Sequence, residues 1–282
     1  MHARGAQPTD RALHALTQEL TYLPETYGGE PEELSKRVPH ILSNDVGLGR
    51  CYMEAAKLMP SPSGGKHAVA LILGEAGIAT ANQLLPTALM VDTRPITLSG
   101  LQVEEIMQHA ACSPEEFLDH MEDYVETSFN PALPKRSHVN IRRHYQDQAF
   151  WWRDNAPDGT PPYFLDGQEA YDTAQDGMGL RIYHQADMSD QEQVTRLGRQ
   201  MTKAGVEVVL ANFSNAYARQ WAGYGVADMA ALVVAHIPFT QGAVVISSDT
   251  HPYDTWTLSR AEMLEGWKAR MAQADPDYAW DG

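Results

Sequence analysis

Five polar side chains follow apolar runs of the chain, at points where a small ligand could be held. They are Asp92, Asp187, Asn212, Ser214 and Asn215. Carboxylates accept hydrogen bonds from hydroxyl or amino groups of a ligand, and amides and hydroxyls can orient a polar substrate. If the preceding runs are parallel strands, their carboxyl ends share one edge of a sheet, where open α/β sheets bind ligands. The alternatives are a solvated strand end for Asp92 and turn formation for the Asn and Ser residues.

The segment 71–95 predicts one half of such a site. An apolar run reaches a turn of sequence GEAG, a helical stretch follows, and a second apolar run ends on Asp92. Small residues let a backbone pass close to a ligand, and the N-terminus of the next helix points its N–H groups at it. We therefore predict that Gly74, Glu75 and Gly77 of this turn contact a cofactor, although the turn lacks the full Gly-x-Gly-x-x-Gly pattern.

The elements that must position these residues alternate between strands and helices. Short, fully apolar runs are typical of buried parallel strands, and five of them lie at 69–73, 88–91, 180–183, 206–211 and 243–246. Helices are predicted at 189–204 and 226–236, on both sides of the fourth strand. This alternation predicts an α/β protein, a Rossmann-like three-layer sandwich with a mostly parallel sheet.

Two regions do not fit the alternation. Residues 1–65 predict an N-terminal helical extension, which is either a lid over a pocket or extra packing surface, and residues 66–282 form the ligand-binding domain. Within that domain, residues 96–179 are too long for a plain crossover, and we interpret them as an inserted helical and aromatic cap. Helices are predicted in it at 101–110 and 114–125, before an aromatic-rich tract at 129–171.

The succession of these elements resembles the class I S-adenosylmethionine-dependent methyltransferase superfamily, whose sheet is a seven-stranded variant of the doubly wound fold. In that resemblance residues 69–77 stand at the first strand and its turn, and Asp92 stands at the acid that binds the ribose. Asp187 stands at the acid that meets the adenine amino group, and residues 211–217 stand where the substrate and the methionine moiety meet. The resemblance covers residues 69–249 and implies S-adenosylmethionine as methyl donor or substrate, but the fourth-strand motif of the methylating families is absent.

The insertion supplies many aromatic side chains, whose faces attract a permanent cation such as a sulfonium. Tyr163 and Tyr171 lie closest in sequence to the third strand, and we predict that they flank the sulfonium. Asn140 and Ser214 are predicted to orient the amino-acid end of the cofactor, which completes the set of candidate catalytic residues. The alternative, stronger for any single aromatic residue, is that these side chains form the small core of the insertion.

Composition argues against several other classes of protein. The 282 residues carry 37 Asp and Glu against 21 Lys and Arg, and a formal net charge of -16 disfavours binding to nucleic acid or to an anionic membrane. Two cysteines are too few for a disulfide framework, and no apolar run reaches the roughly 18 residues of a membrane span. No secretory signal is visible, so we expect a cytoplasmic protein that acts on a small molecule, and a homodimer is compatible with the sequence.

Other catalytic and metal-binding motifs are missing from the sequence. The run Ser63-Gly-Gly-Lys66-His67 lacks the spacing of a P-loop, no Ser lies in a Gly-x-Ser-x-Gly, and no His-Glu-x-x-His or Cys-x-x-Cys occurs, so no metal is predicted. One cluster of cations is either a solvated face or a clamp for a carboxylate. It consists of Lys135, Arg136, Arg142 and Arg143.

Three functions remain open. The leading hypothesis is an intramolecular cyclisation of S-adenosylmethionine to azetidine-2-carboxylate with release of methylthioadenosine, because the layout loosely resembles the azetidine-2-carboxylate synthases on this fold. It also depends on two features: the end of the fourth strand offers no strong general base, and the insertion and N-terminal extension could close over the cofactor. The alternatives are a methyltransferase for a small-molecule acceptor and a non-catalytic binding protein.

Overall fold

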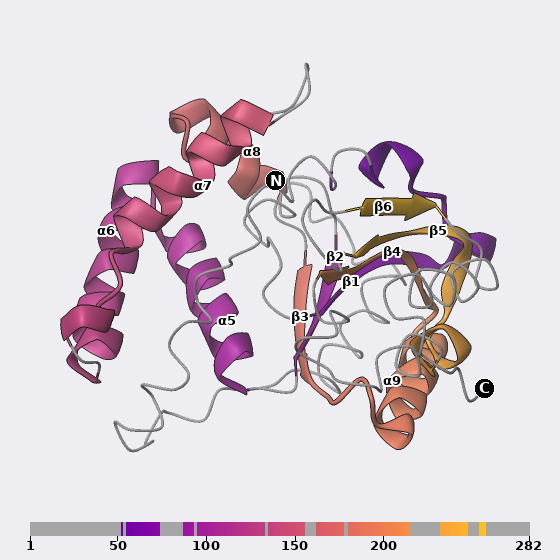
Figure 1. Cartoon of the computed structure of the whole chain (residues 1–282). Coiled ribbons are helices and arrows are strands. Elements are labelled where there is room, and N and C mark those ends of the chain that lie inside the picture. Colours follow the sequence, from indigo (N-terminus) through magenta and orange to yellow (C-terminus); the bar gives the residue numbers. More distant parts are fainter. Residues whose placement is uncertain are drawn as a thin grey trace, which may run out of the picture.

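The computed structural model shows a parallel sheet with helices on both faces and a helical insertion beside it (Figure 1). The structure describes residues 52, 55–73, 87–92, 95–132, 135–155, 162–177, 180–214, 232–247 and 254–257. The predicted turn with Gly74, Glu75 and Gly77, the helix after it and most of residues 1–65 lie outside this part of the chain.

The described part of the sheet has the strand order β3-β2-β1-β4-β5-β6. The strands are β1 (His67–Leu73), β2 (Thr87–Asp92), β3 (Leu180–Gln185), β4 (Val206–Ser214), β5 (Phe239–Ser247) and β6 (Asp254–Thr257). The first five are parallel, and β6 runs antiparallel to β5. All five predicted strands are present, so the predicted α/β fold with a mostly parallel, doubly wound sheet is confirmed.

One face of the sheet packs against α9 (Gln191–Lys203) and residues 232–237. Because successive side chains of a strand point to opposite faces, Val69, Leu71 and Leu73 of β1 enter this layer together with Val194, Leu197 and Met201 of α9. The helix predicted at 189–204 is therefore α9, and residues 232–236 of the helix predicted at 226–236 are helical.

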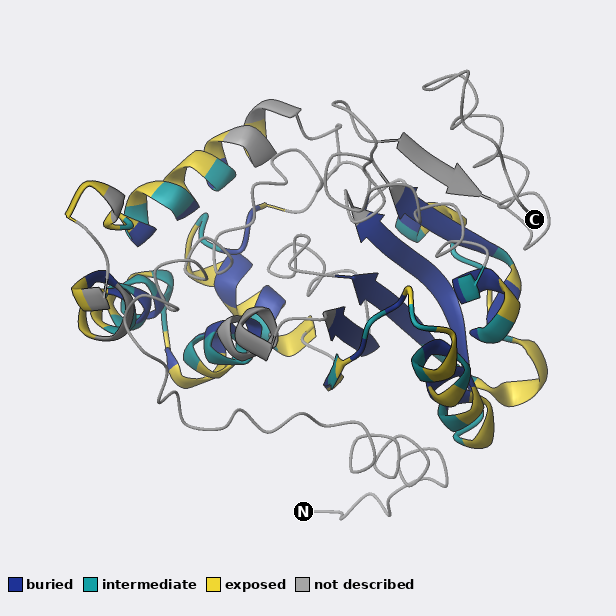
Figure 2. Ribbon diagram, turned by 60° about the horizontal axis from the view of Figure 1, so that its bottom comes forward, coloured by how far each residue is buried: buried dark blue, intermediate teal, exposed yellow. Residues whose placement is uncertain are grey.

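The other face is covered by Tyr52, residues 55–58 and α5 (Pro95–Ala110). Ala70 and Ile72, the intervening residues of β1, pack here with Tyr52 and Ala55 from before the sheet and with Leu101 of α5. Figure 2 shows buried strands between partly exposed helices, which is the pattern of a three-layer sandwich.

The insertion between β2 and β3 has a hydrophobic core of its own. After α5 come α6 (Pro114–Tyr124), the turns η3 (Val125–Phe129), η4 (Asn130–Ala132) and η5 (Lys135–Ser137), then α7 (Ile141–Asn155) and α8 (Gln168–Gly177). Phe117 of α6, Tyr145 of α7 and Tyr171 of α8 are buried together, and no strand residue belongs to this described cluster. The core therefore holds α6, α7 and α8 together as a small helical unit.

The position of α5 divides the predicted insertion 96–179 into two parts. Leu101 packs on the sheet, while the carbonyls of Gln108 and Ala111 at the end of α5 accept hydrogen bonds from α8. Figure 1 accordingly shows α5 between the β3 edge of the sheet and the helices α6 and α7. The helix α5 is thus a crossover helix of the sandwich, and the unit with its own core begins after it.

None of the described helices is long and apolar enough to cross a membrane.

Candidate functional site

The carboxyl ends of the five parallel strands lie along one edge of the sheet. Their register places Asp92 of β2 beside Gln185 of β3, and Ser214 of β4 beside Ser247 of β5. The strand order reverses between β1 and β4, because β1 leads to β2 on one side and pairs with β4 on the other. A doubly wound sheet binds its ligand outside the carboxyl ends at this reversal point. The edge is therefore the candidate site.

The structure brings four of the predicted site residues to this edge. Asp92 and Ser214 are the last residues of β2 and β4, and the structure describes their strand positions without their side chains. Asn212 lies two residues before the end of β4, and Asp187 lies two residues beyond β3. Asn215, like the glycine turn, lies outside the described residues, and its contact with a ligand stays a prediction.

Asp187 sits in a tight turn between β3 and α9. Its Oδ1 accepts hydrogen bonds from the backbone N–H of Ser189 at 2.8 Å and from the Ser189 hydroxyl at 2.6 Å, while its own N–H donates to Gln193 at 3.0 Å. Both side-chain bonds use Oδ1, so the fit of this carboxylate to an adenine amino group depends on Oδ2. Ala186 and Met188 on either side are buried, which gives the turn an apolar setting.

Asn212 is completely buried on the α5 side of the sheet, where its amide nitrogen donates to the hydroxyl of Tyr52 at 2.5 Å. A buried amide without partners would cost about 1–3 kcal/mol, so this bond stabilises both residues where they lie. Tyr52, which is also fully buried, therefore belongs beside the end of β4. The sequence analysis missed it, because a Tyr in a short helical stretch carries no pattern distinguishing this role from packing.

A second polar group joins α5 to β3 on the same face of the sheet. The hydroxyl of Tyr183 donates to Glu105 of α5 at 2.5 Å. Arg181 interacts electrostatically with both side chains. Burial raises the pKa of Glu105, against the lowering effect of the Tyr183 hydrogen bond and of Arg181. Burial likewise lowers the pKa of Arg181 and raises that of Tyr183. A charged residue inside a short apolar run, such as Arg181 in LRIYHQ, is the sequence signal for such a group.

Tyr163 and Tyr171 lie in the core of the insertion. Both are buried among aromatic rings, with Tyr163 4.8 Å from Phe164 and Tyr171 6.3 Å from Phe117 between ring centroids. Their hydroxyls donate to the side-chain oxygen of Gln148 at 3.1 Å and to the carbonyl of Gln108 at 2.8 Å. Burial raises the pKa of both tyrosines. These contacts favour the packing role that the sequence left open, and contact with a sulfonium stays a prediction.

Asn140 is an exposed residue at the start of α7. Its side-chain oxygen accepts a hydrogen bond from the backbone N–H of Arg143 at 2.9 Å, and its carbonyl accepts one from His144 at 3.1 Å. This is the arrangement of a helix N-cap, which satisfies N–H groups of the first turn. The structure gives Asn140 this structural role, and its contact with the amino-acid end of a cofactor stays a prediction.

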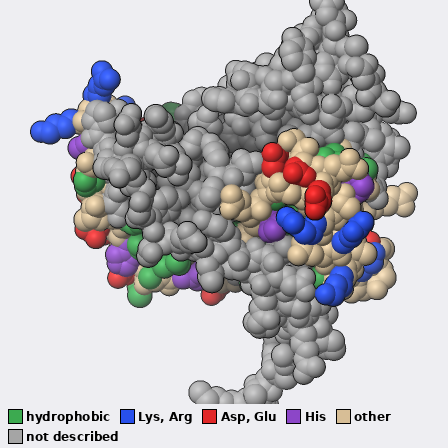
Figure 3. Space-filling model, turned by 90° about the horizontal axis from the view of Figure 1, so that it is seen from below, with side chains coloured by type: hydrophobic (Ala, Val, Ile, Leu, Met, Phe, Trp, Pro, Cys, Tyr) green, Lys and Arg blue, Asp and Glu red, His purple; other side chains and the backbone are tan. Residues whose placement is uncertain are grey.

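The cation cluster of the insertion is partly neutralised by the chain's own acids. Arg142 pairs with Glu115, Asp119 and Glu122 of α6, which raises the pKa of its guanidinium. The carboxylates that this arginine clamps are thus internal, and the contact ties α7 to α6. Mixed charges also occur on a different part of the surface. Figure 3 shows acidic side chains next to basic ones on the side where α9 lies in Figure 1.

The described residues include no group of three His, Cys, Asp or Glu side chains that could hold a metal ion. No metal was predicted from the sequence, and the described part of the site is built from amides, hydroxyls and carboxylates.

Comparison with known proteins gives little further information. No family model matches the chain, and no curated protein matches it in sequence. Among solved structures, the chain is similar to the rRNA methyltransferase aviRa from Streptomyces viridochromogenes, with 16% identity and a TM-score of 0.39 over 94% of this chain and 98% of that one. A likeness this distant carries no argument about fold or function, so both rest on the strand order and the site geometry.

Proposed function

We propose that the protein binds S-adenosylmethionine at the carboxyl edge of its sheet and transfers the methyl group to a small molecule. The observation that carries the proposal is the arrangement of strand ends: an acid ends β2, a second acid follows β3, and the strand order reverses between β1 and β4. An acid at the end of the second strand is suited to the ribose hydroxyls of a nucleoside bound across that reversal.

The proposed roles follow the strand order. Asp92 accepts hydrogen bonds from the ribose, and Asp187 accepts one from the adenine amino group. Asn212, Ser214 and Asn215, at the end of β4, meet the reacting end of the cofactor. The turn with Gly74, Glu75 and Gly77 passes close to the methionine moiety.

Methyl transfer is proposed ahead of cyclisation because of the insertion. The cyclisation hypothesis depended in part on an aromatic insertion that closes over the cofactor. The aromatic side chains of Phe117, Tyr163 and Tyr171 are instead buried in the core of the insertion, beside α5. The end of β4 still offers amides and hydroxyls in place of a strong base, which suits an acceptor that is already nucleophilic. Azetidine-2-carboxylate formation remains an outcome that the product assay would reveal.

The test is binding and product analysis on the full chain. Isothermal titration with S-adenosylmethionine should give a measurable Kd, and Asp92→Ala should weaken it at least about ten-fold, as expected for losing hydrogen bonds to a charged group. The exposed acid Asp176 of α8 offers the matched control, and Asp176→Ala should leave Kd unchanged. Equal affinity of wild type and Asp92→Ala would remove Asp92 from the site.

Mass spectrometry of the nucleoside product then identifies the bond that breaks. With a nucleophilic small-molecule acceptor the proposal predicts S-adenosylhomocysteine. Methylthioadenosine formed from S-adenosylmethionine alone would replace methyl transfer by cyclisation or lysis. Binding with neither product across an acceptor panel would favour a non-catalytic binding protein.

A further inference from the structure

The turn that connects β3 to α9 is held by one amide side chain, that of Gln193. Its Oε1 accepts a hydrogen bond from the backbone N–H of Asp187 at 3.0 Å, and its Nε2 donates to Oδ2 of Asp190 at 3.0 Å. The backbone N–H of Gln193 donates to Oδ1 of Asp190 at 3.1 Å, and the N–H of Asp190 donates to the carbonyl of Asp187 at 3.1 Å. These bonds join Asp187, Asp190 and Gln193 in a closed ring.

The ring departs from the usual start of a helix. Asp190 is the N-cap of α9 and Gln193 is the third residue after it, which is the spacing of a capping box. In a capping box the side chain of that third residue bonds the backbone N–H of the N-cap residue. Here the N–H of Asp190 bonds the carbonyl of Asp187, and Gln193 reaches further back, to the N–H of Asp187. The start of α9 therefore fixes a residue of the candidate site as well as its own first turn.

Ser189 holds the side chain of the same residue. Its hydroxyl and its backbone N–H both donate to Oδ1 of Asp187, at 2.6 and 2.8 Å. Gln193 thus holds the backbone of Asp187 while Ser189 holds one carboxylate oxygen, so the direction of Oδ2 is fixed as well. The buried side chains of Ala186 and Met188 on either side give Oδ2 an apolar setting, in which a matched or mismatched partner counts for more than in water.

The two bonds of the Gln193 side chain require an amide. The N–H of Asp187 needs an acceptor and the carboxylate of Asp190 needs a donor, and a glutamine side chain supplies both. A backbone and a side-chain hydrogen bond from Gln193 lower the pKa of Asp190, so this carboxylate is ionised at neutral pH. A carboxylate at position 193 would keep the acceptor for Asp187 but would repel Asp190.

We propose that Gln193 is a positioning residue of the nucleoside site: it holds Asp187 so that Oδ2 receives the amino group of a 6-aminopurine and rejects a purine with a carbonyl oxygen at that position. This inference rests on the proposed function, in which the purine lies at the end of β3. A carboxylate that meets an amino group gains a hydrogen bond, whereas one that meets a carbonyl oxygen places two acceptors together. A loosely held Asp187 would turn away from the carbonyl, so discrimination depends on how firmly Gln193 holds the turn.

Isothermal titration of the full chain with S-adenosylhomocysteine and S-inosylhomocysteine tests this role. The second compound carries a carbonyl oxygen in place of the amino group of the first. Wild type should bind the adenosyl compound at least about ten-fold more tightly, and Gln193→Glu should lower that ratio about ten-fold, because the bond between the amino group and Asp187 is weakened. Equal binding of both compounds by wild type, or an unchanged ratio in Gln193→Glu, would overturn the proposal.

A second substitution at position 190 provides a rescue. Adding Asp190→Asn to Gln193→Glu exchanges donor and acceptor: the new amide at 190 donates to the new carboxylate at 193, which still accepts from the N–H of Asp187. Asparagine caps helices about as well as aspartate, so the start of α9 is retained. The double variant should return the ratio of the two Kd values to within about two-fold of wild type. A ratio that stays at the value of Gln193→Glu would overturn the pairing.

A control separates positioning from a general loss of helix stability. Ser113→Ala removes the N-cap of α6, where the Ser113 hydroxyl accepts a hydrogen bond from the N–H of Glu116 at 3.1 Å. It should lower the urea midpoint of unfolding and leave both Kd values unchanged. A ratio that falls in Ser113→Ala as it does in Gln193→Glu would assign the effect to stability and overturn the proposal.

Hydrogen exchange tests the hold on Asp187 without any ligand. Gln193→Leu removes the acceptor of the Asp187 N–H, so this amide should exchange at least about ten-fold faster while the amides of β1 stay unchanged. Unchanged exchange at Asp187 would overturn the positioning role. No binding of either compound by wild type would instead contradict the proposed function, and the exchange experiment would still decide whether Gln193 holds Asp187.

Discussion

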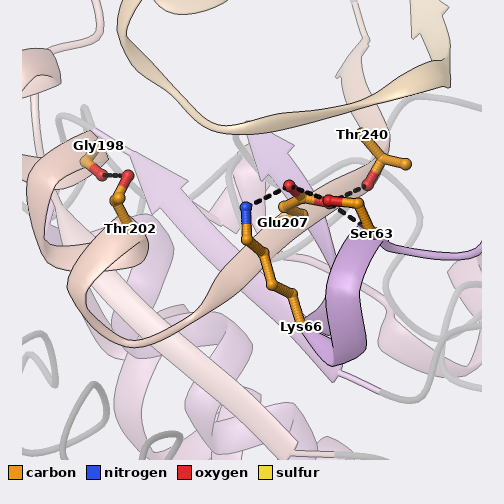
Figure 4. Close-up of polar contacts among 6 residues, drawn as sticks. All are labelled: Ser63, Lys66, Gly198, Thr202, Glu207 and Thr240. Carbon is orange, nitrogen blue, oxygen red and sulfur yellow. Dashed lines mark hydrogen bonds and ion pairs between the residues drawn. The ribbon is translucent and has the colours of Figure 1, made fainter.

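The Glu207 carboxylate, which accepts hydrogen bonds from Ser63, Lys66 and Thr240 (Figure 4), predicts a specific dependence of stability on pH. The pKa of Glu207 is about 2 in the folded protein, against an ordinary value of 4.5, because hydrogen bonds to the carboxylate outweigh its burial. A depressed folded pKa stabilises the protein at pH values above the unfolded pKa. That contribution is lost as the pH falls from about 4.5 towards 2.

The size of the contribution follows from the same shift. A difference of roughly 2.5 pKa units, at about 1.36 kcal/mol per unit, corresponds to about 3 kcal/mol of unfolding free energy at neutral pH. Glu207→Gln keeps the shape of the side chain and removes the charge that Lys66 and Ser63 contact. The variant should therefore unfold more easily than wild type by about 3 kcal/mol at pH 7, and the difference should shrink towards zero near pH 2.

Urea unfolding of both proteins at a series of pH values measures this difference directly. Subtracting the two curves cancels the other carboxylates, which titrate in wild type and variant alike. The control variant is Glu169→Gln on the exposed side of α8, for which the difference from wild type should stay small at every pH. A constant difference between wild type and Glu207→Gln from pH 7 to pH 2 would refute the stabilising role assigned to the Glu207 charge.

Two further predictions concern packing and a half-buried histidine. Gly198→Ala on α9 should destabilise the protein by about 1–3 kcal/mol in urea unfolding, because the new methyl carbon would lie 2.8 Å from the carbonyl carbon of His236 and closer still to its oxygen; unchanged stability would mean that this close approach relaxes freely. Burial lowers the pKa of His144 to about 4 from 6.5. The stability that neutral His144 provides is complete above pH 6.5 and is lost as the pH falls towards 4, so His144→Gln should flatten the stability curve in that window, and an unchanged slope would contradict it.

The strands could be predicted from the sequence because a buried parallel strand needs a short apolar run with little else in it. The run VEVVLA predicted β4, although the strand continues to Ser214 because backbone pairing with β5 extends into the polar residues. The same run contains Glu207, a charge whose partners Ser63 and Lys66 lie more than 140 residues away in sequence. Sequence periodicity carries no information about such distant pairing.

The candidate site was less predictable than the fold. Strand ends identify Asp92 and Asp187 by position, since the edge of a parallel sheet follows from the strand assignments. The aromatic residues Tyr163 and Tyr171 could not be assigned in this way, because the same aromatic richness describes a cap and a small core. Burial distinguishes the two, and both tyrosines are buried in the insertion core.

The most direct test of the central claim is a hydrogen-exchange footprint with S-adenosylhomocysteine on the full chain. The account predicts saturable protection at the carboxyl ends of β1, β2 and β4 and in the turn at Asp187, with the amides of α6 and α7 unchanged. Protection confined to the helical insertion, or no protection at concentrations that saturate other binders of this nucleoside, would contradict a nucleoside site at the edge of the sheet.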